Sequence, residues 1–151
     1  MIALDASAVI YLLKKNQSDP DGERGRKVAE YAAEAISAGI DVALPTVALS
    51  EVLAVPGMDA DSVFGMLDDY DMLDFNTKAA LVAGEIACST NWKSAIPAIP
   101  GGRQLVKLDI LIAGTAIANR ATIILTNDHR YDRFVVNRPI RIVLVDSLPQ
   151  P

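Results

Sequence analysis

The sequence contains a single cysteine and a single histidine among its 151 residues. One cysteine excludes an internal disulfide framework and is typical of a reducing compartment. We expect Cys88, at the end of a predicted helix, to be a buried structural thiol. No His or Cys pair has zinc-site spacing, and the lone His129 is not accompanied by a nucleophile elbow for a Ser-His-Asp triad. Zinc and serine-hydrolase chemistry are therefore disfavoured.

Long apolar runs are also missing. The unbroken apolar runs stay well short of the ~18–20 residues that a membrane span requires. Asp5 stands where a secretory signal would carry Lys or Arg, and the basic pair Lys14-Lys15 follows the first apolar run instead of preceding it. We therefore predict a cytoplasmic protein without a membrane segment. Gly-rich phosphate loops of the P-loop or dinucleotide-binding type are absent from the sequence as well.

The charge balance is acidic, with a formal net charge of −5 and a pI of about 4.7. Such a balance argues against a nucleic-acid binder, but acids gathered around a metal ion are neutralised by it. Charge alone therefore leaves the partner open. Trp92 is expected to serve packing or a partner contact rather than base stacking. The basic residues that are candidates for phosphate contacts are Lys14, Lys15, Arg103, Lys107 and Arg130.

Short apolar strands alternate with helical periodicity along the chain, in which 51% of the residues are hydrophobic. Segments 16–25 and 91–104, rich in polar residues, Pro and Gly, are predicted loops. The alternation predicts an α/β fold with three layers, α/β/α, and a central, mostly parallel sheet, in one domain over residues 1–151. The predicted strands are 2–4, 42–44, 72–75, 122–125 and 142–145; the predicted helices are 7–13, 26–38, 46–55, 59–67, 76–88 and one that contains Asp109 and ends near 119, with a turn or short helix at 128–134.

Four carboxylates interrupt segments that otherwise consist of core residues. Asp109 lies inside an apolar helix, and Asp5, Glu51 and Asp128 occupy comparable positions. A buried carboxylate without a partner is strongly unfavourable, and no Lys or Arg in the core of the Asp109 helix can pair with it. The recurrence of this pattern suggests one shared cation site.

The predicted topology brings these acids together. Asp5 and Asp128 follow strands, and ligands of such sheets bind at the carboxyl ends of the strands. We expect Glu51 and Asp109 to lie in the first turn or so of helices that face the same crevice. Four neighbouring carboxylates take up protons or hold a cation, and Mg²⁺ and Mn²⁺ prefer oxygen ligands. Such ions suit hydrolysis of a phosphodiester.

Each acid also has a simpler structural explanation. Asp5 or Asp109 could cap a helix, Glu51 could point to solvent, and Asp128 could belong to a turn. Asp132 is expected to be a solvated turn residue, although it remains an alternative to Asp128 as the last ligand. Four further acids are expected to form a solvated face and a strand edge: Asp68, Asp69, Asp71 and Asp74.

In this order, the acidic segments resemble the PIN-domain ribonuclease family. The resemblance extends from Ile2 to about Val145, and the length of the chain is similar to that of VapC-type toxins of type II toxin–antitoxin pairs. It implies a PIN-like α/β/α fold. The motifs that carry it are Asp5–Ile10, Ser50–Leu53, Lys107–Ala116 and Thr126–Asp128, followed by Asp132-Arg133-Phe134.

The resemblance also implies a function and a set of site residues. It implies an endoribonuclease toxin that depends on Mg²⁺ or Mn²⁺, cleaves RNA, forms a homodimer and is inhibited by a small cognate antitoxin. Two alternatives stay open: a PIN-like module that binds RNA or protein without cutting, and an RNA-processing nuclease without a toxin role. The implied catalytic and metal-binding residues are Asp5, Glu51, Asp109 and Asp128, supported by hydrogen bonds from Ser7, Thr126 and Asn127.

Overall fold

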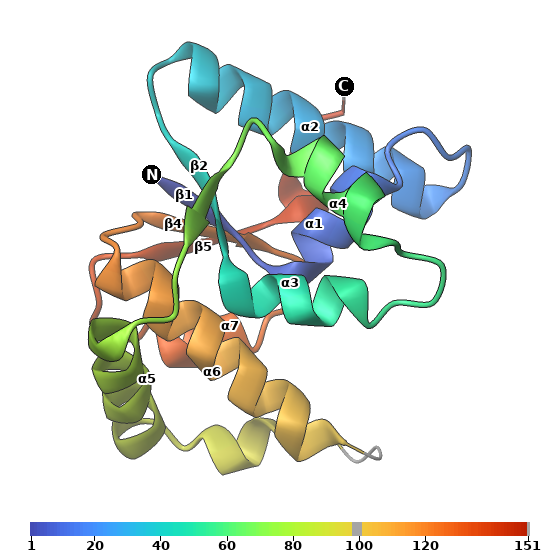
Figure 1. The fold of residues 1–151 in the computed structure, drawn as a ribbon. Helices are drawn as coiled ribbons and strands as arrows, with labels where there is room; N and C mark the ends of the chain where they lie inside the picture. The colour runs from blue at the N-terminus through green and yellow to red at the C-terminus, as the bar shows by residue number, and fades with distance from the viewer. Residues whose placement is uncertain (98–100, 151) are drawn as a thin grey trace.

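The computed structural model describes residues 1–97 and 101–150, and Figure 1 shows their α/β architecture. The described strands and helices follow the predicted order. They are β1 (Ile2–Leu4), α1 (Ala6–Leu13), α2 (Pro20–Ser37), β2 (Val42–Pro45), α3 (Thr46–Leu53), α4 (Ala60–Leu67), β3 (Asp71–Leu73), α5 (Thr77–Ser89), the 3-10 helix η1 (Trp92–Ala95), α6 (Gly102–Ala118), β4 (Ile123–Thr126), α7 (Tyr131–Phe134), β5 (Arg141–Leu144) and the 3-10 helix η2 (Val145–Ser147).

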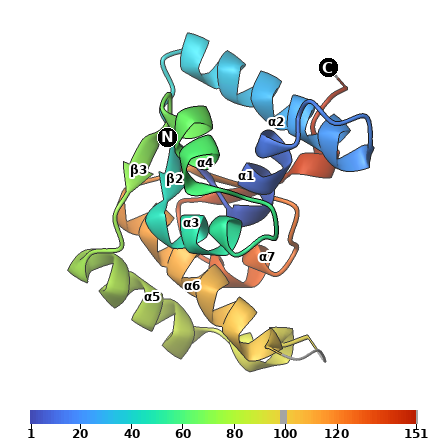
Figure 2. The same ribbon diagram turned by 45° about the vertical axis from the view of Figure 1, so that its right-hand side comes forward.

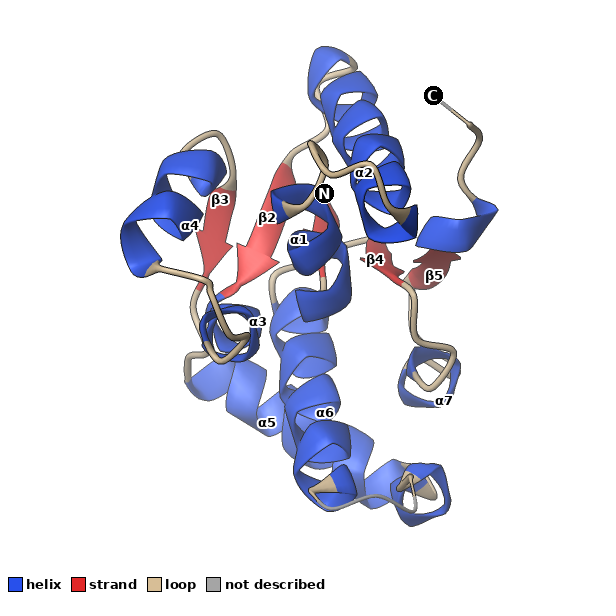
Figure 3. Ribbon diagram, turned by 90° about the vertical axis from the view of Figure 1, so that its right-hand side faces the viewer, coloured by secondary structure: helices blue, strands red, loops and turns tan. Residues whose placement is uncertain are grey.

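The sheet formed by the described residues has five strands in the order β3-β2-β1-β4-β5, and each pairing among them is parallel. Helices α1 and α2 cover one face, while α5 and α6 cover the other (Figures 1 and 3). The predicted α/β class with a central parallel sheet is confirmed. The chain builds β2 and β3 on one side of β1 and then returns to build β4 and β5 on the other, so β1 and β4 flank the point where ligands of such sheets bind.

The central strands consist of core residues. All residues of β1, β2 and β4 are buried, as expected for parallel strands that are covered on both faces. The edge strands β3 and β5 are more exposed, and Figure 2 shows β3 beside β2 at one edge of the sheet. The buried pairing of β1 with β4 therefore fixes the spacing of the two segments that follow them.

Two predicted loops contain helix instead. Helix α2 begins at Pro20, inside the predicted loop 16–25, and Asp19 caps it by accepting a hydrogen bond from the Gly22 amide (2.8 Å). Asp, Pro and Gly signal a loop, but an N-cap Asp followed by Pro also starts a helix. Gly25 of α2 packs directly against the backbone of α1, because a Cβ at this position would lie 2.1 Å from the Tyr11 carbonyl oxygen.

The predicted loop 91–104 contains η1 and the first residues of α6, whereas residues 98–100 lie outside the described residues. The prediction that Cys88 is buried is wrong, because its side chain lies on an exposed position of α5. The apolar neighbours Ile86 and Ala87 suggested burial, but successive helical residues point in different directions, and Ile86 occupies the buried position. None of the described helices has the length and hydropathy needed to cross a bilayer.

Helices α5 and α6 pack closely through a glycine, and this contact generates a prediction. A Cβ at Gly114 of α6 would lie 2.7 Å from the Ala83 Cβ of α5, whereas a Cβ at Gly84 would meet no atom within 4 Å. We expect Gly114→Ala to lower the free energy of unfolding by ~1–3 kcal/mol through overpacking. The matched control Gly84→Ala should raise it by ~0.4–1 kcal/mol through chain entropy. Urea unfolding of the two variants measures both effects, and equal effects would contradict the described packing.

Candidate active site

Asp5 follows β1 directly and caps α1. Its Oδ1 accepts hydrogen bonds from the Ala8 amide (2.9 Å) and the Ser7 hydroxyl (2.8 Å), and its Oδ2 accepts one from the Thr126 hydroxyl (2.6 Å). These donors and the N-terminus of α1 stabilise a carboxylate that is only 4% exposed. Capping therefore fixes Asp5 at the carboxyl edge of the sheet, where the acidic crevice was predicted.

Glu51 and Asp109 come from α3 and α6, two helices in contact. Glu51 is half-buried, and Asp109 is 7% exposed among the buried residues of α6. The expectation that Asp109 lies in the first turn of its helix is wrong, because α6 begins at Gly102 and Asp109 lies near its middle. Capping by Asp109 is excluded for the same reason. Buried residues one turn away, Val106 and Ala113, hold this face of the helix against the core.

Asp128 lies in the turn after β4, and its amide donates to the Thr126 hydroxyl (3.0 Å). Its Oδ1 accepts a hydrogen bond from the Arg130 amide (2.8 Å), and its Oδ2 accepts one from the Arg130 Nε (2.6 Å) and also contacts Nη2. The same Nη2 lies 3.2 Å from Asp109 Oδ2. The guanidinium group of Arg130 therefore bridges Asp109 and Asp128.

The four acids share one electrostatic environment. Burial raises the pKa of Glu51 to about 7, with a further contribution from the Asp5 carboxylate and an opposing one from Arg130. Burial also raises the pKa of Asp109 to about 7; Arg130 opposes this shift, and the three other carboxylates add to it. Burial raises the pKa of Asp5 against the hydrogen bonds from Thr126, Ala8 and Ser7. The four acids that the sequence singled out are thus near enough to act on one another electrostatically.

Tyr131 is part of this environment, and the sequence analysis did not identify it. Its side chain is fully buried in α7, and burial and the four carboxylates raise its pKa well above the ordinary value. Within the described residues, its hydroxyl oxygen and Asp109 Oδ2 are buried without a hydrogen-bond partner, so the 3.2 Å contact with Arg130 is an ion pair without hydrogen-bond geometry. The spacing of Tyr131 and Phe134, whose rings pack edge to face at 5.8 Å, was the available signal for a buried helical face.

The three residues predicted to support the acids by hydrogen bonds form a network around Asp5. Ser7 and Thr126 donate to it directly, and the Asn127 amide donates to the Ser7 hydroxyl oxygen (3.0 Å). The Asn127 side chain in turn donates to the Oδ2 atom of Asp146, which belongs to η2 (3.2 Å). The positions of β1, β4 and η2 are thus coupled to the orientation of one carboxylate.

Other candidates lie apart from the acids. Asp132 is exposed on α7, whereas Asp128 is among the carboxylates that perturb Asp5 and Asp109. Lys14 forms an ion pair with Asp21 (2.8 Å). Of the five basic residues considered for phosphate contacts, Arg130 is the one whose described contacts reach the acidic cluster.

The donor chemistry of the cluster fits a hard divalent cation. The ligands available are carboxylate oxygens, and a buried Asp109 oxygen has no hydrogen-bond donor in the described structure. Among the described residues, however, no three His, Cys, Asp or Glu side chains converge closely enough to surround one ion. The guanidinium group of Arg130 instead contacts two of the four carboxylates, Asp109 and Asp128.

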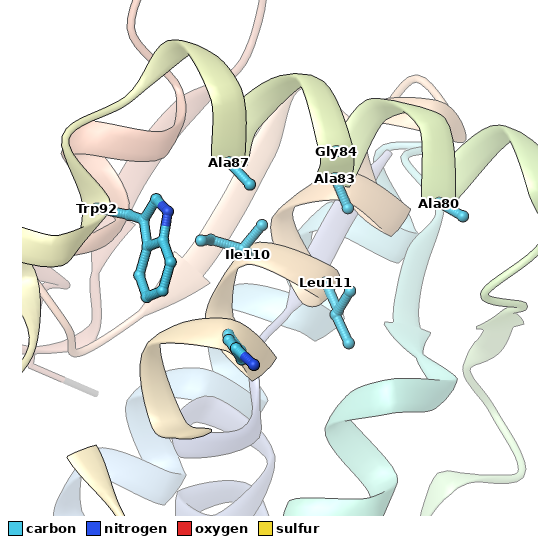
Figure 4. Close-up of a pocket in the computed structure, with 8 residues that line it drawn as sticks. Ala80, Ala83, Gly84, Ala87, Trp92, Ile110 and Leu111 are labelled. Carbon is cyan, nitrogen blue, oxygen red and sulfur yellow. The ribbon is translucent and has the colours of Figure 1, made fainter. Parts of the chain in front are cut away.

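An apolar pocket lined by residues of α5 and α6 and by Trp92 lies outside this cluster. It has a volume of about 370 Å³, and Figure 4 shows Trp92 and alanines of α5 around it. Arg103 lies over the Trp92 ring, 5.9 Å from its centroid. Trp92 therefore has a packing role in this structure, which is one of the two roles expected from the sequence.

Comparison with protein families matches residues 2–136 to the PIN domain. The chain belongs to the PIN domain family. PIN domains are generally nucleases, so the acids at the carboxyl edge of the sheet lie in a nuclease fold. Among the curated proteins, none matches this sequence significantly.

Two solved structures share the fold over nearly the whole length of both chains. One is the crystal structure of VapBC2 from Rickettsia felis bound to a DNA fragment from their promoter, with a TM-score of 0.66, 18% identity, and coverage of 95% of this chain and 98% of that one. The other is DNA-bound VapBC from Salmonella typhimurium, with a TM-score of 0.66, 20% identity, and coverage of 95% and 97%. At these identities the likeness concerns the fold.

The raised pKa of Asp109 predicts how stability depends on pH. Asp109 titrates at about 7 in the folded chain and at about 4 in an unfolded one. Between these values the folded state binds more protons, so this group destabilises the metal-free protein as pH rises. We expect Asp109→Asn to remove that contribution. In EDTA, the Tm of this variant minus that of wild type should therefore become more positive from pH 5 to pH 8.

The exposed residue Asp74 provides the control. The corresponding Tm difference for Asp74→Asn should stay constant over the same pH range, because its carboxylate lies in solvent. A pH-independent difference for Asp109→Asn would contradict the assignment of a raised pKa to this residue.

Proposed function

We propose that the protein is a metal-dependent endoribonuclease that acts as the toxin of a toxin–antitoxin pair. The observation that supports the proposal most directly is the shared environment of Asp5, Glu51, Asp109 and Asp128. These acids come from four separate segments, and two of them have a pKa of about 7. Membership in the PIN domain family supports nuclease chemistry at this position.

The proposed ion is Mg²⁺ or Mn²⁺, with Asp5 and Asp109 as its main ligands and Glu51 and Asp128 completing the site directly or through water. A divalent cation bound by these residues would supply Lewis-acid stabilisation of the charge that develops on a phosphodiester. Carboxylates with a raised pKa release protons when they bind a cation, so the ion and the proton compete for Glu51 and Asp109. Ser7 and Thr126 orient the Asp5 carboxylate through hydrogen bonds.

The proposed partners are an RNA substrate, a small antitoxin and a second copy of the chain, in the cytoplasm. The two structural relatives are VapBC assemblies bound to DNA, which supports an antitoxin partner. A short open reading frame directly beside the gene, whose product co-purifies with this chain, would distinguish a toxin from an RNA-processing nuclease. An RNA-maturation role is the alternative if no such partner exists.

The central test is cleavage of total cellular RNA with increasing Mg²⁺ or Mn²⁺, mapped by end sequencing. We expect Asp5→Asn and Asp109→Asn to lower the cleavage rate by about 100-fold or more, the scale of loss when one electrostatic contact to a reacting group is removed. Both variants should also lose toxicity in cells. Circular dichroism should show that both keep the wild-type fold.

Asp74→Asn is the matched control, since it makes the same substitution at an exposed acid that is not among the groups shifting the pKa of Asp5, Glu51 or Asp109. It should cleave like wild type. Normal cleavage by Asp5→Asn or Asp109→Asn would contradict the proposed mechanism. Tight RNA binding without metal-dependent cleavage by the wild-type protein would favour a binding module instead.

A further inference from the structure

Arg130 is the cation that the structure places among the candidate ligands. Its Nε donates to Asp128 Oδ2 at 2.6 Å, its Nη2 contacts the same oxygen, and Nη2 lies 3.2 Å from Asp109 Oδ2. One positive group thus contacts two of the four acids. Its single positive charge offsets one of these two carboxylate charges without an ion from solution while Arg130 stays in place.

The contact with Asp109 is the more informative one. Asp109 Oδ2 is buried and has no hydrogen-bond donor within the described residues, although Arg130 lies close to it. An Arg–carboxylate pair that served stability alone would favour two parallel hydrogen bonds with both oxygens satisfied. The geometry instead leaves a buried oxygen with a charge nearby and no donor, which is an arrangement that a directly coordinating cation would complete.

Arg130 is also able to leave this position without unfolding its surroundings. Its side chain is 27% exposed, and the residue precedes the short helix α7. The backbone amide of Arg130 donates a separate hydrogen bond to Asp128 Oδ1 (2.8 Å). This bond does not involve the guanidinium group, so the turn keeps it when that group leaves the two carboxylates. Flexible side-chain torsions alone can therefore open the space between Asp109 and Asp128.

We propose that Arg130 is a built-in counter-ion that occupies the cation position between Asp109 and Asp128 and competes with the divalent metal for it. The proposal rests on the metal site of the proposed function. Arg130 offsets part of the negative charge of the metal-free cluster, and a bound metal would take the place of its guanidinium group. Apparent metal affinity is then lowered by the fraction of time that the side chain blocks the site.

The experiment measures binding of Mn²⁺ alone to the full chain, without RNA, from the electron paramagnetic resonance signal of free Mn²⁺. We expect Arg130→Gln to lower the Kd for Mn²⁺ by about tenfold, the change for a site that is blocked about nine-tenths of the time. Arg130→Lys keeps the charge but lacks the planar fork, so it should also tighten binding, by a smaller factor. The rise of Tm with Mn²⁺ gives a second readout that applies even if a variant folds only with the metal.

Arg133→Gln is the matched control. Arg133 lies in α7, the short helix that follows Arg130, and its Nη1 donates to the Ser94 hydroxyl oxygen (2.9 Å), away from the acids. This variant removes the same charge and should bind Mn²⁺ like wild type. A Kd that also falls in Arg133→Gln, or that stays at the wild-type value in Arg130→Lys, would reduce the role of Arg130 to general electrostatics and overturn the proposal.

The remaining outcomes separate this proposal from the proposed function. Equal or weaker Mn²⁺ binding by Arg130→Gln, with normal binding by wild type, would overturn the competition and leave the metal centre intact. Absence of Mn²⁺ binding in wild type and in both Arg130 variants would overturn the metal centre and the competition together.

Discussion

Repulsion among like charges at the carboxyl edge of the sheet is the constraint on which the rest of the site depends. Two carboxylates about 5 Å apart repel by roughly 3 kcal/mol at an effective dielectric constant of 20. The chain compensates each acid differently: hydroxyl and amide donors surround Asp5, Arg130 bridges Asp109 and Asp128, and the pKa of Glu51 rises to about 7. Protons, an arginine and donor groups thus perform the neutralisation that a divalent cation would perform in the proposed nuclease.

The fold couples this neutralisation to the core. Asp5 and Thr126 meet because β1 and β4 are paired, with Leu4 opposite Leu125, and both strands are buried. Residues 121 positions apart in sequence therefore share one hydrogen bond at the carboxyl ends of the two paired strands. A change that shifts the register of either strand would displace Asp5 from its donors, so the stability of the central sheet and the geometry of the site are not independent.

The sequence predicted the parts of the structure that depend on hydrophobic pattern. Asp109 was identifiable because an apolar helix surrounds it, and Asp5 and Asp128 because strands precede them. Helix starts were less predictable, since Asp19 and Pro20 signal a loop and a helix N-terminus alike. The bridge made by Arg130 depends on one side-chain conformation in a turn. The burial of Tyr131 depends on how a four-residue helix packs against the core. The bridge leaves no periodic signal, and the burial of Tyr131 leaves only the helical spacing between Tyr131 and Phe134.

The two edges of the sheet have a consequence for association between copies. The edge strand β3 has only three residues and begins with the exposed Asp71, and the opposite edge strand β5 begins with the exposed Arg141. Joining two copies through either edge would place a charged side chain, Asp71 or Arg141, at the junction. Short, charged edges of this kind oppose growth of a sheet from one molecule into the next. Self-association through helical surfaces avoids burying these charges, and edges of this kind also disfavour fibrillar aggregation of the folded chain.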